Sequence, residues 1–346
     1  MSHQIKLFPS GRTVAWQEGD TALEALERAG YALPNNCRAG ACGECKVHVR
    51  SGEFDQGFVL DMALSQDERT QGFGLMCMAK PVSEVLEIEW GTADAKPILF
   101  PPRDSQYAIL VDRIARTPRI SEFVLRPLGE PMRFWPGQYV QLGDSSRGIP
   151  VRSYSIANAP RADGEIRLQV TRVDAGSAEA ATAEGRTSRW LHDEVQPGDT
   201  LRFSGPHGTF IGDPSVDTPV LCLAAGSGLA PILSLAEAAL RRGFKQPVTL
   251  MFSARDASEL YDRGLMRYWE ARYPNFRYLP TTTRLASAGI AHGRIPAILG
   301  EHFPDLSGYS VFVAGTPSFV DDCVAAARAL GATAPLIHTE GFFAQG

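Results

Sequence analysis

With 346 residues, the chain is too long for one ordinary domain and suits two or three. Its hydrophobic fraction of 44 % and charged fraction of 21 % are those of a globular protein, and a net charge of -5 without a basic run argues against nucleic acid as a partner. No apolar signal segment opens the chain, and no stretch reaches the roughly 18 apolar residues that a membrane span needs. We therefore expect a cytoplasmic protein without a membrane partner.

The first predicted domain covers residues 1–92 and combines short strands with one helix. Thr21 and Glu24 have the spacing of a capping box, and Gly30 is placed to stop the helix that follows, so we expect a helix at 21–29. Strand patterns lie at 5–8, 13–16, 46–50 and 85–90.

Four of the six cysteines lie in this first segment, at Cys37, Cys42, Cys45 and Cys77. Their C-x4-C-x2-C spacing with a distant fourth cysteine is typical of plant-type 2Fe–2S ligation. Glycines within the loop let the backbone curl around a cluster and bring its amides close to the sulfurs. A structural zinc site is the alternative, but zinc knuckles usually pair two C-x2-C units, and this loop has one. The four cysteines are thus the predicted metal ligands.

The other two cysteines, Cys222 and Cys323, stand in apolar surroundings and are expected to be buried thiols without a redox role. The first segment as a whole resembles plant-type ferredoxins, which implies a β-grasp (α+β) fold with the cluster near the surface. A proline-rich stretch at 93–103 without periodicity predicts a semi-rigid linker.

The second predicted domain, residues 104–213, is a run of short strands broken by Gly, Pro and Asp, which indicates an antiparallel β-barrel or sandwich. Strand patterns lie at 108–114, 121–125, 138–142 and 166–172. The tetrapeptide Arg152-Ser153-Tyr154-Ser155 follows a strand pattern, and a Gly-Pro-His-Gly sequence follows at 205–208. Together they resemble the flavin-binding signature of the ferredoxin–NAD(P)+ reductase family, which predicts an antiparallel β-barrel.

This resemblance implies that Arg152 neutralises the flavin pyrophosphate, that Tyr154 faces the isoalloxazine, and that Ser155 lies near its N5. Gly185, Thr187 and Ser188 match the second phosphate loop of the family, although 174–184 resembles an insertion just before it. Members with an N-terminal ferredoxin domain usually hold FAD, so the resemblance favours FAD over FMN.

The third predicted domain, residues 214–346, alternates strands and helices, which predicts a parallel, Rossmann-like α/β sheet. Strands are expected at 220–225, 248–253, 276–279 and 310–314, and helices at 231–242 and 318–330. The first strand runs into Gly226-Ser227-Gly228 and then Pro231, a strand–turn–helix context that suits a pyrophosphate.

Two more positions resemble the nicotinamide site of the same family. Arg255 follows the strand that faces the adenine ribose, and Gly315 belongs to a motif in which Ala314 replaces the usual cysteine. Acidic residues close behind Arg255 favour NADH, whereas Arg255 itself would suit the 2′-phosphate of NADPH. We expect NADH.

The C-terminal tail contains Glu340, Phe342 and Phe343. It resembles the acidic and aromatic ending of the family, which implies a glutamate near the flavin and an aromatic ring over the face that the nicotinamide reaches. Ser155 and Glu340 are the candidate catalytic residues. Ordinary C-terminal packing is the alternative.

The order of the three segments resembles the reductase components of bacterial ring-hydroxylating dioxygenases and related multicomponent monooxygenases and demethylases. This implies that electrons pass from NADH through FAD and a 2Fe–2S cluster to a terminal oxygenase or an intermediate ferredoxin. Alternatives are another acceptor (a deoxysugar dehydrase or a haem-thiolate monooxygenase), a non-enzymatic redox sensor, and a zinc-stabilised flavin reductase.

Overall fold

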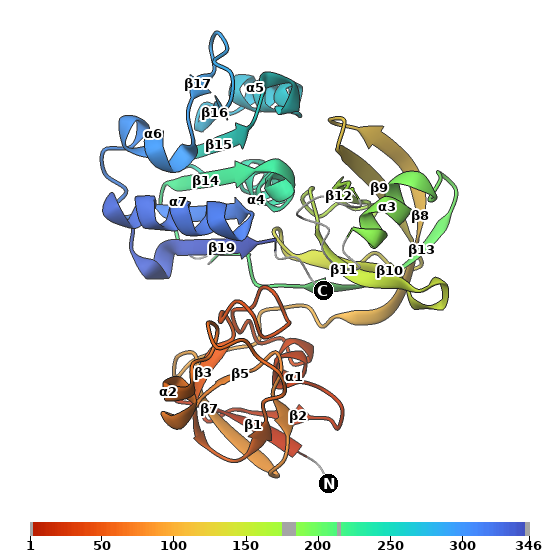
Figure 1. Cartoon of the computed structure of the whole chain (residues 1–346), viewed down its shortest axis with the longest axis vertical. Helices are drawn as coiled ribbons and strands as arrows, with labels where there is room; N and C mark the ends of the chain where they lie inside the picture. The colour runs from red at the N-terminus through yellow and green to blue at the C-terminus, as the bar shows by residue number, and fades with distance from the viewer. Residues whose placement is uncertain (1–2, 175–184, 213–215, 343–346) are drawn as a thin grey trace. The chain divides into compact units, whose positions relative to one another are not determined.

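The computed structural model describes residues 3–174, 185–212 and 216–342. They form two compact units (Figure 1): one contains residues 3–103 and 205–209, and the other contains the remaining described residues. Among the described residues, no helix is both long enough and apolar enough to cross a membrane.

The first unit is built on a mixed five-stranded sheet with the order β2-β1-β7-β3-β5. β1 pairs in parallel with β7, whereas its pairing with β2 and the pairings of β3 are antiparallel. The elements are β1 (His3–Phe8), β2 (Thr13–Trp16), α1 (Ala22–Arg28), β3 (Lys46–Ser51), β4 (Phe54–Asp55), α2 (Gln66–Thr70), β5 (Phe73–Leu75), β6 (Lys80–Pro81) and β7 (Val85–Glu89). This is the predicted β-grasp arrangement.

Helix α1 shows why the local prediction succeeds in this unit. The Thr21 side chain accepts a hydrogen bond from the Glu24 backbone, and the Glu24 carboxylate accepts one from the Thr21 backbone, so the capping box is present. Gly30 follows the helix with a φ of +84°, a conformation that glycine adopts without strain. The apolar face, with Leu23 and Leu26 fully buried, packs into the core beneath the sheet.

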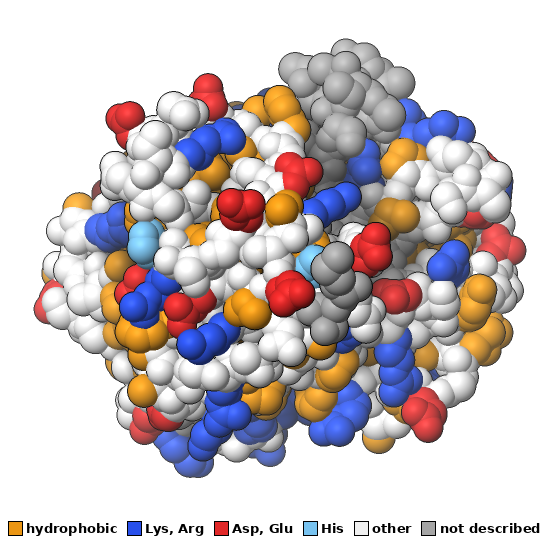
Figure 2. Space-filling view, turned by 90° about the horizontal axis from the view of Figure 1, so that it is seen from below, with side chains coloured by type: hydrophobic (Ala, Val, Ile, Leu, Met, Phe, Trp, Pro, Cys, Tyr) orange, Lys and Arg blue, Asp and Glu red, His pale blue; other side chains and the backbone are white. Residues whose placement is uncertain are grey.

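On the face drawn in Figure 2, acidic and basic side chains are interspersed.

The second unit begins with a six-stranded sheet ordered β11-β10-β13-β8-β9-β12. A bridge between Ile156 and Leu168 joins the ends of its two outermost strands, which makes the sheet barrel-like. The strands are β8 (Arg103–Ala115), β9 (Ile120–Leu128), β10 (Tyr139–Asp144), β11 (Ile149–Ser155), β12 (Ile166–Thr171) and β13 (Thr200–His207), with helix α3 (Arg186–Asp193) beside β11. From its sequence, the tetrapeptide at 152–155 is predicted to follow a strand. It lies inside β11, because its residues continue the pairing with β10.

The same unit continues into a second six-stranded sheet, ordered β17-β16-β15-β14-β18-β19, in which all neighbouring strands are parallel. The elements are β14 (Val220–Ala225), α4 (Leu229–Arg241), β15 (Val248–Ala254), α5 (Arg263–Arg272), β16 (Phe276–Thr282), β17 (Ala291–His292), α6 (Ile295–His302), β18 (Ser310–Gly315), α7 (Pro317–Ala329) and β19 (Ile337–Gly341). Side chains of α4 and α5 pack in one apolar cluster, and those of α6 and α7 in another, so helices cover both faces.

The strand order of this sheet reverses at β14, which lies between β15 and β18. In open parallel sheets, ligands bind outside the carboxyl ends of the strands at such a reversal. The glycine turn that follows β14 is therefore placed at the position where a dinucleotide is expected. Cys222 on β14 and Cys323 on α7 are buried among apolar neighbours, as predicted.

Candidate functional site

The cysteine loop lies in the first unit, between α1 and β3, and Cys77 lies two residues after the end of β5. Backbone amides of Ala39, Ala41 and Cys42 donate to the Cys37 sulfur at 3.3–3.4 Å. The Cys77 amide likewise donates to the Cys45 sulfur at 3.4 Å. Amide donors aimed at sulfur stabilise thiolates and the negative charge that a reduced cluster carries.

The pKa values of the four thiols shift in opposite directions within two hydrogen-bonded pairs: those of Cys37 and Cys77 are lowered, and those of their partners Cys42 and Cys45 are raised. The pKa of Cys37 is lowered to about 5, chiefly by a hydrogen bond from the Cys42 side chain and then, against burial, by the loop amides. Among the described residues, no three His, Cys, Asp or Glu side chains are arranged to hold a single metal ion.

Three residues of the loop, Arg38, Gly40 and Gly43, have a positive φ, of 54°, 69° and 80°. A Cβ at Gly40 would lie 2.9 Å from Val59 Cγ1 and 3.0 Å from the Phe58 carbonyl, so this position requires glycine. The next segment of chain thus packs directly on the loop, where the Leu60 amide donates to the Gly40 carbonyl at 3.0 Å.

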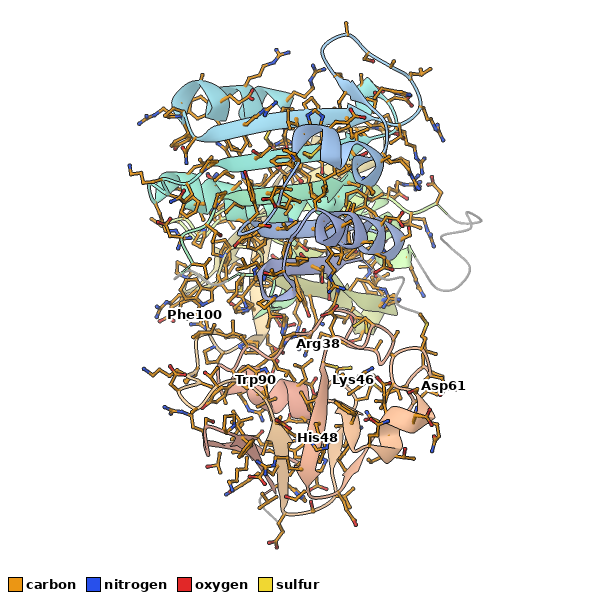
Figure 3. The ribbon with its side chains drawn as sticks, turned by 90° about the vertical axis from the view of Figure 1, so that its left-hand side faces the viewer. Arg38, Lys46, His48, Asp61, Trp90 and Phe100 are labelled. Atoms are coloured by element: carbon orange, nitrogen blue, oxygen red, sulfur yellow. The ribbon has the colours of Figure 1, made fainter. Side chains whose placement is uncertain are left out.

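Arg38 is held by a buried carboxylate that the sequence analysis did not select. Its Nη1 contacts both carboxylate oxygens of Glu27 at 2.7 Å, and the Glu27 side chain is 3 % exposed. Burial raises the pKa of Glu27, but Arg38 and His207 outweigh it and bring that pKa down to about 2. The labelled side chains Arg38 and Lys46 mark the two ends of the loop in Figure 3. An ion pair between α1 and the loop therefore fixes the backbone next to Cys37.

The candidate flavin residues converge on β11 and the first turn of α3. Thr187 donates to the Pro150 carbonyl at 2.6 Å, which ties α3 to the strand that carries Arg152, Ser153 and Tyr154. Tyr154 packs against the barrel core, and burial raises its pKa above the ordinary value. The first turn of α3 is thus joined to β11, although the two segments are distant in the sequence.

The turn before α3 depends on Gly185, which has a φ of +71°. A Cβ there would lie 2.7 Å from the Val173 carbonyl. Ser188 closes the turn, because its hydroxyl donates to the Gly185 carbonyl at 2.9 Å and accepts from the Val173 amide at 3.1 Å. Most of the predicted insertion, residues 175–184, lies outside the described residues.

Ser155 and Glu340 meet, although they are 185 residues apart. The Ser155 hydroxyl donates to Glu340 Oε1 at 2.9 Å, and both residues are 8 % exposed. Burial raises the pKa of Glu340 to about 8, against the smaller lowering by Ser155. Glu340 Oε2 is buried without a hydrogen-bond partner among the described residues, so a polar group from a ligand would be accommodated there.

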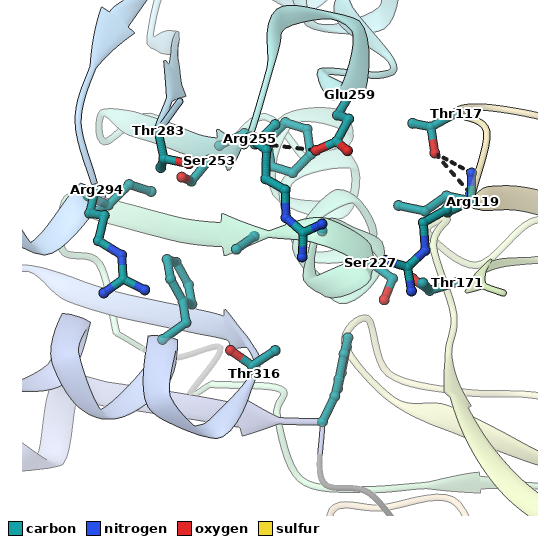
Figure 4. Close-up of a pocket in the computed structure, with 18 of the residues that line it drawn as sticks. Thr117, Arg119, Thr171, Ser227, Ser253, Arg255, Glu259, Thr283, Arg294 and Thr316 are labelled. Atoms are coloured by element: carbon teal, nitrogen blue, oxygen red, sulfur yellow. Dashed lines mark hydrogen bonds between the residues drawn. The ribbon is translucent and has the colours of Figure 1, made fainter. Parts of the chain in front are cut away.

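A cleft of about 370 Å³ opens between the barrel and the parallel sheet, within the second unit (Figure 4). Gly226 and Ser227 line it from the glycine turn, Arg255 from the end of β15, and Phe342 from the chain after β19. The Arg255 amide donates to the Glu259 carboxylate at 3.2 Å, so an acidic group is held at the same edge. Phe343 lies outside the described residues.

Three other predicted residues have structural surroundings rather than a place in the cleft. A Cβ at Gly228 would lie 2.2 Å from the Ala314 carbonyl, so this glycine allows α4 to approach β18. Pro231 is buried inside α4, and the Gly315 carbonyl accepts from the Phe342 amide at 2.8 Å. Gly226, with a φ of +57° and open space around it, is the glycine that faces the cleft.

Several residues that line the cleft were missed by the sequence analysis. They come from the barrel and from the later helices: Thr117, Arg119, Thr171, Arg294, Thr316 and Asp322. Thr316 directly follows Gly315 of the predicted nicotinamide motif; the other five belong to no recognisable motif, and only the folded chain brings them together.

Matches to protein-family models agree with this geometry. Residues 5–82 match the 2Fe-2S iron-sulfur cluster binding domain, residues 110–211 the oxidoreductase FAD-binding domain, and residues 222–325 the oxidoreductase NAD-binding domain. The protein is thus an oxidoreductase with binding domains for a 2Fe–2S cluster, FAD and a nicotinamide dinucleotide.

Full-length relatives narrow this class. The chain is 35 % identical to the reductase subunit of an aromatic O-demethylase from an Amycolatopsis species, covering 96 % of each chain. It is 30 % identical to the phenol hydroxylase P5 protein of Acinetobacter pittii, covering 99 % of this chain and 95 % of the relative. It therefore belongs to the ferredoxin–NAD(P)+ reductase family whose members carry an N-terminal 2Fe–2S ferredoxin domain.

Solved structures support the same fold. A crystal structure of an Amycolatopsis cytochrome P450 reductase matches with a TM-score of 0.86 and 32 % identity, covering 98 % of each chain. The ferredoxin reductase of a carbazole 1,9a-dioxygenase matches with a TM-score of 0.72 and 24 % identity over 99 % of each chain, a likeness of fold alone.

Proposed function

We propose that this protein takes electrons from NADH and delivers them singly to a terminal oxygenase that acts on aromatic compounds. The observation that carries the proposal is the union of three redox-binding domains in one chain with a full-length relative named as the reductase subunit of an aromatic O-demethylase. When bound, FAD accepts both electrons of a hydride and releases them one at a time, which suits a one-electron cluster. We expect this electron transfer to take place in the cytoplasm.

For the cluster we propose Cys37, Cys42, Cys45 and Cys77 as ligands. The loop amides that point at two of these sulfurs support the assignment, because they would stabilise a cluster of increasing negative charge. For the flavin we propose the surface formed by β11 and the turn at Gly185. Ser155 and Glu340 are proposed beside the flavin ring, where burial keeps the Glu340 carboxyl neutral at neutral pH and the Ser155 hydroxyl donates a hydrogen bond to it.

For the dinucleotide we propose NADH rather than NADPH. Glu259 is held at the end of β15, where a carboxylate binds a 2′-hydroxyl and repels a 2′-phosphate. Arg255 and Arg294 reach the same cleft and oppose this preference. The ratio of kcat/KM for NADH to that for NADPH tests it: a ratio well above one is expected, and Glu259→Gln should lower the ratio.

The acceptor is tested by reconstitution. The purified holoprotein is mixed with NADH and a candidate oxygenase, and product is measured against NADH consumed. We expect an aromatic-demethylating oxygenase to turn over with tight coupling. Flavin and cluster absorption that does not bleach with NADH would contradict the whole proposal.

A haem-thiolate monooxygenase is the second candidate acceptor. It is favoured by the structural match to a protein named as a cytochrome P450 reductase. The same assay with such a haem protein separates the two, since reduction of its haem is followed directly by its spectrum. Turnover with an intermediate ferredoxin, but not with either oxygenase alone, would indicate an additional carrier.

A further inference from the structure

One wall of the dinucleotide cleft is supplied by the barrel, through the loop that joins β8 and β9. Arg119 of this loop lines the cleft together with Thr117 and Thr171. Figure 4 shows its guanidinium beside Ser227 of the glycine turn and Thr171, while Arg294 lies at the opposite end of the cleft. A cation from the barrel is therefore placed beside the glycine turn.

The backbone that carries Arg119 is held on both sides. The Thr117 hydroxyl accepts from the Arg119 amide at 3.2 Å and from the Ile120 amide at 2.9 Å. The Arg119 carbonyl accepts from the Arg172 amide of the neighbouring chain segment at 2.7 Å. Because these bonds fix the backbone of the loop, little conformational entropy of the loop remains to be lost when a ligand binds.

Arg116, at the start of the loop that carries Arg119, joins this loop to the part of the second unit that contains the parallel sheet. This arginine bridges Glu122 of β9 at 2.9 Å and Asp262, which begins α5, at 3.1 Å. Next to Asp262, the Tyr261 hydroxyl donates to the Gly226 carbonyl, with an oxygen-to-oxygen distance of 3.0 Å. The glycine turn and the Arg119 loop are thus fixed to one buried polar network.

A nicotinamide dinucleotide carries two negative charges on its pyrophosphate. The glycine turn offers amide donors and the positive end of α4, but none of its three residues is a cation. A guanidinium has the planar fork that binds phosphate oxygens in pairs. We propose that Arg119 binds the pyrophosphate of the dinucleotide, so that the flavin-binding half supplies part of the nicotinamide site. This rests on the proposed use of NADH.

Dissociation constants for ADP and for adenosine test the proposal, because the two ligands differ in the phosphates alone. They are measured by calorimetry on the full holoprotein and on Arg119→Gln, Arg119→Lys and Arg126→Gln. Arg126 is the matched control: it is an exposed arginine of β9 and does not line the cleft.

We expect Arg119→Gln to weaken ADP about tenfold or more, the effect of one charge-assisted hydrogen bond, and to leave adenosine unchanged. Arg119→Lys should retain part of the ADP affinity, and Arg126→Gln all of it. In turnover, KM for NADH should rise while kcat is kept, since uniform binding is lost.

Unchanged ADP affinity in Arg119→Gln, or an equal loss for adenosine, would overturn the inference. Retained FAD content and an unchanged flavin spectrum show that the variant is folded, and the lysine variant gives a second reading if the glutamine variant is not. Failure of the proposed function would differ, because the unmodified protein itself would then not be bleached by NADH.

Discussion

The cysteine loop and the dinucleotide cleft provide for negative charge in different ways. In the loop, three of the four candidate ligands lie within nine consecutive residues, from Cys37 to Cys45, and the donors to the Cys37 sulfur are amides of the same stretch. In the cleft, the groups come from the barrel, the glycine turn, the end of β15 and the chain after β19. The cysteine loop, which is made by one stretch of backbone, should no longer bind a cluster when one ligand is lost. The cleft, which is built from several segments, should lose only part of its affinity when one residue is changed.

The largest effect is expected from Cys45→Ser. Removing one of four cluster ligands should abolish cluster binding, because the buried loop has no exchangeable fourth donor of the same chemistry. Iron and acid-labile sulfide should fall to background, and NADH-driven reduction of one-electron protein acceptors should stop. Flavin bleaching by NADH should continue, since it takes place in the other unit. Cys323→Ala, a buried thiol of α7, is the control and should keep its iron. Full iron content in Cys45→Ser would refute the ligand assignment.

Glu27→Gln tests whether the loop needs support from outside its own sequence. Breaking a buried ion pair typically costs about 4 kcal/mol, because the Arg38 charge loses its partner. Urea unfolding of the full chain, followed by cluster absorption, should show this loss. Glu87→Gln breaks the more exposed pair between Glu87 and Lys6 and should change stability by less than about 1 kcal/mol.

The pH dependence of this variant has a definite sign. Glu27 has a folded pKa of about 2 and an ordinary value of 4.5, so its contribution to stability is complete above 4.5 and disappears as the pH falls through 2. The free energy of unfolding of Glu27→Gln should therefore be lower than that of the unmodified protein at neutral pH. On acidification it should fall by less than that of the unmodified protein. Equal acid sensitivity of the two proteins would show that Glu27 carries no such linkage.

The contrast between the two sites also explains what the sequence could predict. The cysteine spacing and the capping box at Thr21 are local patterns, so they could be recognised without a structure. The parallel sheet followed from strands that alternate with helices. Arg119 and Glu27 could not be selected, because neither belongs to a motif and their neighbours come from distant segments. Helix α3 was missed because it follows the predicted insertion, and the strand position of Arg152 was missed because proline and glycine precede it at 148–150.

Substitution of the two glycines of the turn, Gly226 and Gly228, should have different effects on stability, although both belong to the same sequence motif. Gly228→Ala places a Cβ at 2.2 Å from the Ala314 carbonyl and should cost about 2 kcal/mol, because α4 must move away from β18. Gly226→Ala meets open space and should cost about 1 kcal/mol for its φ of +57°. Thermal unfolding measures the difference in stability between the two variants. KM for NADH should rise in both variants, and equal stability of the two would contradict the packing role of Gly228.

Glu340→Gln tests the assembled site by its pH dependence. Burial raises the pKa of Glu340 to about 8, so the carboxyl is mostly neutral at pH 7 and mostly ionised above pH 8. An anion in this dry position would oppose the arrival of a hydride, and at pH 9 roughly a tenth of the molecules keep the proton. The rate of flavin reduction by NADH in the unmodified protein should thus fall about tenfold by pH 9, while Glu340→Gln, which mimics the neutral acid, should stay flat.

Ser155→Ala gives an independent check on that assignment. The Ser155 hydroxyl lowers the pKa of Glu340, so its removal should move the inflection in the rate to higher pH. Stability should follow the same group: the ordinary pKa of 4.5 lies below the folded value, so the unfolded chain releases the proton first and the free energy of unfolding falls between pH 4.5 and about 8. In Glu340→Gln, the free energy of unfolding should not show this decrease. An inflection near pH 8 that survives in Glu340→Gln would assign the rate dependence to another group and remove Glu340 from the chemistry.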